Sequence, residues 1–302
     1  MTGTNHREYP DEDIMEMARQ IRRDIMKMLM ISQSGHSGGP LGLADIFACL
    51  YFKILKYDTA NLAWPERDYF FLSAGHLAPV WYATLARAGF FPITELSTLR
   101  KINTRLQGHP APAYTHGAPG VEIASGSLGQ GLSIAAGTAL GLRMDKKLNR
   151  VVVLHGDGEL DEGQIWEAAM TAGHYQLDNL TAIVDRNFCQ IDNRTDKVME
   201  VEPVADKWRA FRWNVIECDG NDVADFSKAM GKAIAFKGKP SVVIAKTFMG
   251  KGVSFMHDDY RWHGVPPNEE QGKQALNELG ETRFGDFVTF EWEKEVPQTV
   301  KQ

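Results

Sequence analysis

The residues with the clearest chemical potential are an acid and an amide, each following a short apolar segment. Asp157 lies between two glycines directly after residues 151–155, and Asn187 closely follows the apolar residues 180–184. Residues 159–175 between these segments have helical spacing. A strand–helix–strand unit brings both strand ends to the same edge of a parallel sheet. We therefore expect Asp157 and Asn187 to lie side by side at the edge where ligands bind in open α/β sheets.

The acidity of this turn determines what it could bind. Its glycines let the backbone approach a phosphate closely. However, Glu159, Asp161 and Glu162 follow Asp157, and no lysine completes a phosphate-binding loop. A bare phosphate would be repelled, whereas a hard cation between acid and phosphate removes the conflict. The oxygens of Asp157 and Asn187 suit Mg²⁺ or Ca²⁺. The segment thus predicts a metal-bridged diphosphate, and a plain surface turn is the alternative for Gly-Asp-Gly alone.

Several ordered segments resemble the signatures of the transketolase family, between about residue 14 and about residue 270. They are Ser34–Gly42, Arg67–His76, Gly108–Pro110, Ser125–Gly131 and His263–Gly264, together with the Gly156–Gly158 turn and Asn187, which resemble the thiamine diphosphate motif. The resemblance implies an α/β fold with a doubly wound, mostly parallel sheet and helices on both faces. This is the diphosphate-binding (PP-type) domain of thiamine diphosphate enzymes.

The resemblance also implies roles for individual residues. The catalytic residues facing the donor sugar would be His36, His109 and His263. The cofactor, thiamine diphosphate, would be bound by His76, Gly126, Leu128, Gly158, Glu162, Asn187 and again His263. The metal, Mg²⁺ with Ca²⁺ or another divalent cation as alternatives, would be held by the side chains of Asp157 and Asn187 and the backbone carbonyl of Cys189. Glu162, with Glu167, would join an acidic network near a subunit boundary. Without the resemblance, each histidine would be assigned a structural or surface role.

The family pattern further implies that this chain needs a partner. In the family, the glutamate that activates the cofactor belongs to a pyrimidine-binding domain, and the 302-residue chain ends before such a domain. We expect the N-terminal subunit of a split transketolase, which transfers a two-carbon ketol unit from a ketose phosphate to an aldose phosphate, as in the pentose phosphate pathway. Its partner would be a C-terminal subunit carrying the pyrimidine-binding domain, with two copies of each chain in a heterotetramer.

Two other functional classes stay open at the level of sequence. One is another thiamine diphosphate enzyme, either the α subunit of a 2-oxo acid dehydrogenase or a deoxyxylulose phosphate synthase. The other is a non-catalytic nucleotide-binding α/β domain. The other thiamine diphosphate enzymes share the Asp157/Asn187 motif but not the combination of His36, His109 and His263. The histidines in their glycine-rich contexts favour the transketolase interpretation.

Composition argues against several other classes of protein. The net charge is −6 and no basic patch with interleaved aromatic residues occurs, so nucleic acid is not an expected partner. Cys49, Cys189 and Cys218 are scattered, which suits a reducing cytoplasm rather than a disulfide framework. No apolar stretch is long enough to predict a membrane span.

Periodicity predicts the elements that position these residues. We expect helices at 14–31, 41–55, 79–88, 94–102, 128–144, 159–175, 204–211, 222–236 and 269–279. We expect strands at 69–72, 151–155, 180–184, 213–217 and 241–245. Residues 107–120 and 247–268 are expected to form long loops, which are often functional. A single domain would span 1–302, with polar extensions at 1–13 and about 284–302.

Overall fold

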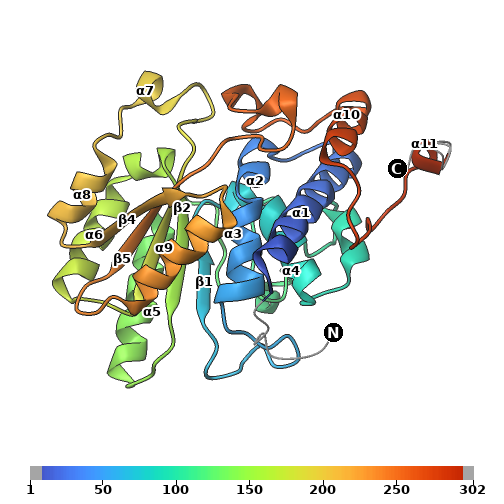
Figure 1. Cartoon of the computed structure of the whole chain (residues 1–302). Helices are drawn as coiled ribbons and strands as arrows, with labels where there is room; N and C mark the ends of the chain where they lie inside the picture. The colour runs from blue at the N-terminus through green and yellow to red at the C-terminus, as the bar shows by residue number, and fades with distance from the viewer. Residues whose placement is uncertain (1–8, 295–302) are drawn as a thin grey trace.

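A computed structural model, which describes residues 9–294, contains one sheet of five parallel strands (Figure 1). In spatial order they are β1 (Tyr69–Leu72), β2 (Val151–Gly156), β3 (Leu180–Arg186), β5 (Ser241–Lys246) and β4 (Asn214–Asp219). The register pairs Gly156 with Asp185, so β2 and β3 end together. The five predicted strands and their parallel arrangement are confirmed.

The strands bury alternate side chains against two separate helical layers. Val152, Leu154 and Ile183 belong to a core shared with α1 (Asp11–Ser32), α3 (Ala44–Cys49), α4 (Ala78–Ala88) and α9 (Val223–Ala235). Val151, Val153 and Val184 belong to a second core with α5 (Gln130–Met144), α6 (Gly163–His174) and α8 (Val204–Ala210). Figure 1 shows α9 crossing the front of the sheet. Because both faces are covered, β2 and β3 are apolar at successive positions, and the predicted doubly wound fold is confirmed.

Three predicted helices are interrupted near the functional edge. Residues 41–55 form no single helix but a succession of α2 (Gly38–Gly42), α3 and a π-helical turn, Leu50–Ile54. Gly42 lies so close to Phe248 that a Cβ atom there would be 2.7 Å from the Phe248 carbonyl oxygen. Gly129 has φ +83°, so α5 begins at Gln130 rather than at residue 128. A 3₁₀ turn, Gly158–Asp161, precedes α6.

The prediction of a helix at 94–102 is wrong beyond Thr98. A 3₁₀ helix covers Ile93–Thr98, after which Leu99 is extended and Arg100 has φ +59°. The amide N–H of Arg100 donates to the carbonyl of Leu106 at 2.9 Å. This contact reverses the chain and directs it toward His109.

The last described residues pack against α1. After α10 (Glu269–Leu279), the chain leads to α11 (Glu291–Lys294). Arg23 pairs with Asp286 at 2.6 Å, and the fully buried Lys27 pairs with Glu293 at 2.7 Å. The described part of the predicted 284–302 extension therefore packs on the domain, whereas residues 1–8 and 295–302 lie outside the described residues. Between Tyr9 and Lys294, no helix is long and apolar enough to cross a membrane.

Candidate functional site

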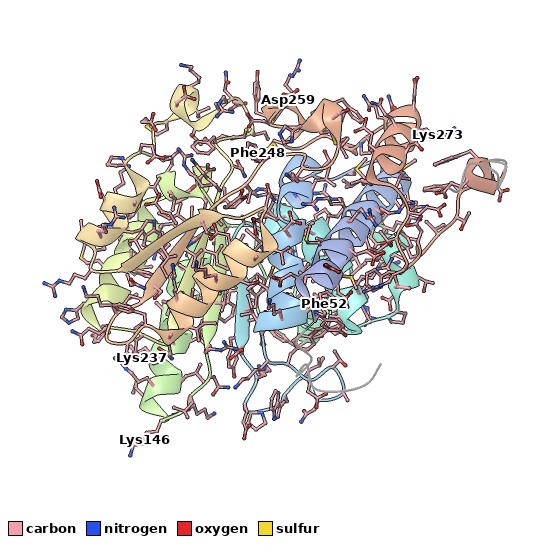
Figure 2. The ribbon with its side chains drawn as sticks, viewed as in Figure 1. Phe52, Lys146, Lys237, Phe248, Asp259 and Lys273 are labelled. Carbon is pink, nitrogen blue, oxygen red and sulfur yellow. The ribbon has the colours of Figure 1, made fainter. Side chains whose placement is uncertain are left out.

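A cavity of about 330 Å³ lies at the carboxyl edge of the sheet. It is lined by every predicted site residue except Glu162. Figure 1 shows α7 (Thr195–Val198) and the loop after β5 above this edge. In Figure 2, Phe248 and Asp259 mark that loop, whereas Lys146 and Lys237 mark the opposite end of the molecule. The topology therefore brings together residues from distant parts of the sequence.

Asp157 is held rigidly at the end of β2. Its side chain is 1% exposed. One carboxylate oxygen accepts from Arg186 Nη1 and from the Phe188 N–H, both at 2.7 Å, and the other accepts from the Gly158 N–H at 2.8 Å. Burial raises the pKa of Asp157, and the charge of Arg186 opposes that shift. The buried ion pair fixes the carboxylate before any ligand binds.

Asn187 is oriented by a buried acid that the sequence analysis did not select. Its amide nitrogen donates to Asp185 at 2.7 Å, and the Thr247 hydroxyl donates to the other Asp185 oxygen. The Asn187 oxygen accepts from the Cys189 N–H at 2.9 Å. Burial raises the pKa of Asp185 to about 7. Asp185 thus sets which end of the Asn187 amide presents oxygen, the orientation a metal ligand needs.

The donor atoms in this corner fit a hard divalent cation. Within residues 9–294, no three His, Cys, Asp or Glu side chains cluster closely enough to hold a metal on their own. Asp157 and Asn187 offer two oxygens, and phosphate oxygens could complete a Mg²⁺ shell. Burial raises the pKa of the Cys189 thiol to about 12, so this thiol stays protonated and Cys189 could contribute through its backbone carbonyl.

Three imidazoles in the lining of the cavity form a triangle. The ring centroids of His36, His76 and His263 are 5.0, 5.1 and 5.6 Å apart. Burial lowers the pKa of His36 to about 4 and of His76 to about 3, and it also lowers the pKa of His263. Nδ1 of His36 and Nδ1 of His263 are buried and have no hydrogen-bond partner among the described residues. These neutral rings retain unused hydrogen-bonding capacity.

His109 reaches the cavity from an exposed loop. Gly126 lies against its ring, since a Cβ atom at Gly126 would be 3.1 Å from His109 Cγ, and Gly126 has φ +138°. Any side chain at Gly126 would therefore be strained and would crowd the histidine. Burial lowers the pKa of His109, with a further lowering from the charge of Arg100. The structure brings His109 to the same cavity as the other three histidines.

Glu159 is a lining residue that sequence reasoning noted only for its charge. It is 3% exposed, and it accepts from the Ser73 hydroxyl, the Gly129 N–H at 2.8 Å and the Gly156 N–H at 3.2 Å. Ser73 in turn accepts from the Gly131 N–H at 3.1 Å. One carboxylate thus joins the ends of β1 and β2 to the loop before α5. Its position directly after Gly158 was the one sign in the sequence that Glu159 belongs to the site. Its three hydrogen-bond donors could not be identified there, because they are a distant side chain and two backbone N–H groups.

Glu162 lies outside the cavity lining. It is exposed in the single chain and immediately precedes α6, beside Gly129. Glu167 is also exposed. The isolated chain therefore gives neither glutamate a cofactor contact, and their predicted place in an acidic network at a subunit boundary stays a prediction.

Comparison with known proteins gives consistent matches. The family model described as "Transketolase, thiamine diphosphate binding domain" matches residues 12–302. The 6-deoxy-6-sulfo-D-fructose transketolase subunit SqwG of Clostridium sp. (strain MSTE9) is 42% identical over 88% of this chain and 96% of its own length. An apulose-4-phosphate transketolase subunit of Actinobacillus succinogenes is 39% identical over 89% of this chain and 96% of its own.

A similar fold occurs in a solved, longer structure. Transketolase from Campylobacter jejuni superposes with a TM-score of 0.84 and 32% identity. The match covers 94% of this chain and 45% of the Campylobacter chain. The chain therefore spans less than half the length of this structural neighbour, but nearly the whole length of the two subunits.

Proposed function

Because this chain belongs to the transketolase family and matches its thiamine diphosphate-binding domain, we propose that it is the diphosphate-binding subunit of a two-chain transketolase. The complete enzyme would move a two-carbon ketol unit from an anionic ketose to an aldose. The observation that carries this proposal is the single cavity shared by Asp157, Asn187 and the four histidines. The names of the two full-length relatives as subunits support a divided enzyme.

The part of the cavity lined by Asp157 and Asn187, here called its floor, would hold the cofactor and its metal. Asp157, Asn187 and the carbonyl of Cys189 would bind Mg²⁺, with Ca²⁺ as an alternative. Gly158, His76 and His263 would contact the diphosphate, and Gly126 and Leu128 would hold the aminopyrimidine. When bound, thiamine diphosphate supplies the nucleophilic carbon for ketol transfer. Three buried acids line this floor, Asp157, Glu159 and Asp185, so a cation is needed before a diphosphate can bind there.

The histidines that line the cavity would transfer protons to and from the sugar. Ketol transfer requires removal of a proton from a donor hydroxyl and its later return. His36, His109 and His263 are candidates for this task because burial lowers their pKa values, so each ring is neutral near pH 7 and would offer a nitrogen lone pair to a sugar hydroxyl. The unpartnered Nδ1 atoms of His36 and His263 are free to contact sugar hydroxyls.

The partner chain would cover the outer face of α5 and complete the site. Gly137 and Gly141 have open space around them, and Ile134 and Met144 are exposed on the same helix. The exposed Glu162 would meet the partner at this boundary. We propose two copies of each chain, a cytoplasmic location, and neither nucleic acid nor membrane among the partners.

A reconstitution experiment tests the proposal. The chain is purified alone and with a pyrimidine-domain subunit encoded beside it, and ketol transfer is measured with thiamine diphosphate and Mg²⁺. We expect activity only in the mixture, with a matching rise in mass by light scattering. Full activity of the isolated chain would refute the two-chain enzyme, and absence of transfer in a complex that binds the cofactor would refute ketol transfer.

A further inference from the structure

We propose that a second cavity of this chain binds a small aliphatic carboxylate and that Lys246 holds the carboxylate group. The second cavity has a volume of about 330 Å³, within the range of pockets that take small ligands. Among the described residues, none lines both this cavity and the one that contains Asp157 and the histidines, here called the first cavity. The inference therefore concerns a separate site and does not depend on the proposed ketol transfer.

The topology of the sheet explains why a second cavity lies at its carboxyl edge. Ligands of open α/β sheets bind where neighbouring strands send the chain to opposite faces. β1 leads to α4 in one core and β2 leads to α6 in the other, and the first cavity lies beside the ends of these two strands. The same divergence occurs between the neighbouring strands β3 and β5, because β3 leads through α7 to α8, whereas β5 leads to α10. The second cavity lies here, next to the start of α8, which packs against β4 (Figure 1).

Four charged side chains line the second cavity, and one of them has no partner of opposite charge among the described residues. Arg186 Nη2 donates to Glu202 at 2.8 Å, and the carboxylate of Glu217 lies 3.5 Å from Arg209. The fourth charged side chain is Lys246, whose ammonium group forms no hydrogen bond or ion pair with any residue that the structure describes. Its charge is therefore available to an anion.

The neighbouring strand makes an anion beside Lys246 favourable. In the register of the sheet, Arg186 of β3 pairs with Lys246 of β5, so two cations lie next to each other on one face. The charge of Arg186 is balanced by Asp157 and Glu202, at 2.7 and 2.8 Å. The ammonium group of Lys246 lies 6.0 Å from the centroid of the Phe188 ring, which also lines the cavity. Like charges on adjacent strands repel each other, and an anion bound at Lys246 would offset that repulsion.

The rest of the lining selects the class of anion. Val204 and Ile244 are buried side chains that offer apolar surface to the body of a ligand. Burial raises the pKa of the Cys218 thiol to about 12, so this part of the lining is also uncharged near pH 7. Glu202 and Glu217 would repel a second negative charge, which disfavours a phosphate dianion. A monoanionic carboxylate with an aliphatic body matches both the single free ammonium group and the apolar surface.

The test follows the binding of 3-methylbutanoate to the full chain by the methyl NMR signals of Ile244 and Val204. Two further probes separate the parts of the ligand, because 3-methylbutanol keeps the body without the charge and inorganic phosphate keeps a charge without the body. We expect saturable shifts with 3-methylbutanoate and a dissociation constant at least about 10-fold higher for each of the other probes. Saturation with thiamine diphosphate and Mg²⁺ should not displace 3-methylbutanoate, because the two cavities are separate.

Substitutions locate the site. Lys246→Gln should raise the dissociation constant for 3-methylbutanoate about 10- to 100-fold, the cost of a lost charge-assisted hydrogen bond, and should leave that for 3-methylbutanol unchanged. Ala205→Phe places a large side chain in the lining and should abolish binding of both. Lys239→Gln is the matched control, since Lys239 is an exposed cation just before the opposite end of β5. Urea denaturation shows whether each variant is folded.

Three results would overturn the proposal. The first is the absence of saturable shifts in the wild-type chain, and the second is equal affinity of Lys246→Gln and wild type for 3-methylbutanoate. The third is displacement of 3-methylbutanoate by thiamine diphosphate, which would assign the shifts to the first cavity. Tighter binding of inorganic phosphate than of 3-methylbutanoate would likewise contradict the aliphatic carboxylate. Ketol transfer enters none of these measurements, so failure of the proposed function would leave the second site standing, and the reverse also holds.

Discussion

Two groups of side chains that line the cavity, the buried acids of its floor and the histidines, differ in whether their polar atoms already make hydrogen bonds. On the floor, Asp157, Asp185 and Glu159 are buried, and each carboxylate oxygen already accepts a hydrogen bond. Among the histidines, the Nδ1 atoms of His36 and His263 are buried and have no hydrogen-bond partner in the described structure. The acids of the floor are therefore held in place by hydrogen bonds before ligands bind. The histidines would form their missing hydrogen bonds with the ligands. Substitutions on the floor should affect binding and stability, and substitutions of His36 and His109 should affect turnover.

The largest effect is expected at Asp157. Asp157→Ala should abolish metal-dependent thiamine diphosphate binding and lower the free energy of unfolding by about 3–5 kcal/mol, because it removes one partner of a buried ion pair with Arg186. Calorimetry of cofactor binding and urea denaturation measure the two effects. Asp161→Ala is the matched control, since Asp161 is exposed and its carboxylate accepts a hydrogen bond from a single side chain among residues 9–294, that of Gln190. Unchanged cofactor affinity in Asp157→Ala would show that the floor of the cavity does not bind the cofactor.

A histidine that lines the cavity should show the opposite pattern, with turnover reduced and cofactor binding kept. His109→Ala should lower kcat by about 10²- to 10⁴-fold, the usual cost of losing a positioned proton-transfer group, while the cofactor still binds. Cofactor titration and steady-state kinetics on the complex separate the two quantities. His76→Ala provides the contrast, because His76 should act mainly on cofactor affinity. Wild-type kinetics of His109→Ala with every ketose donor would end its catalytic role.

Glu159 tests whether the floor also supports the loop before α5. Glu159→Ala leaves the Ser73 hydroxyl and the N–H groups of Gly129 and Gly156 without their acceptor, so cofactor affinity should fall by at least about 10-fold. Glu159→Gln keeps one acceptor oxygen and should recover much of the affinity. Asp145→Asn, at the exposed end of α5, serves as control. If Glu159→Ala bound the cofactor as tightly as wild type, the loop would need no such anchor.

A further effect should be a pH dependence of stability, which requires no ligand. The folded-state pKa values of His36 and His76 are lowered to about 4 and about 3, from 6.5. Between these values and pH 6.5 the unfolded chain binds more protons than the folded chain, so stability should fall as the pH drops from about 6.5. Urea denaturation of the cofactor-free chain at pH 7, 6 and 5 measures the slope. The double substitution His36→Asn, His76→Asn should make the slope shallower without abolishing it, because burial also lowers the pKa of His155 to about 4; an unaltered slope would contradict the burial of both rings.

The sequence predicted the elements with strong local signals and failed where distant contacts decide. Apolar runs identified β2 and β3, and their shared edge placed Asp157 beside Asn187. The break at Glu162 follows a 3₁₀ turn, and the reversal after Thr98 is closed by the bond between the Arg100 N–H and the Leu106 carbonyl, neither of which hydrophobic periodicity indicates. Asp185 could not be selected from the sequence, because its role depends on Thr247, 62 residues further along the chain in the loop after β5.

The buried Lys27 has a consequence for protein engineering. Its ammonium group is fully buried and is neutralised by Asp286 and Glu293, from the last described stretch of the chain. Truncation before Asp286 would strand the cations of Lys27 and Arg23 without their anions. A genetic fusion that joins this chain to its partner should therefore keep the sequence through residue 294 and place the tether after it.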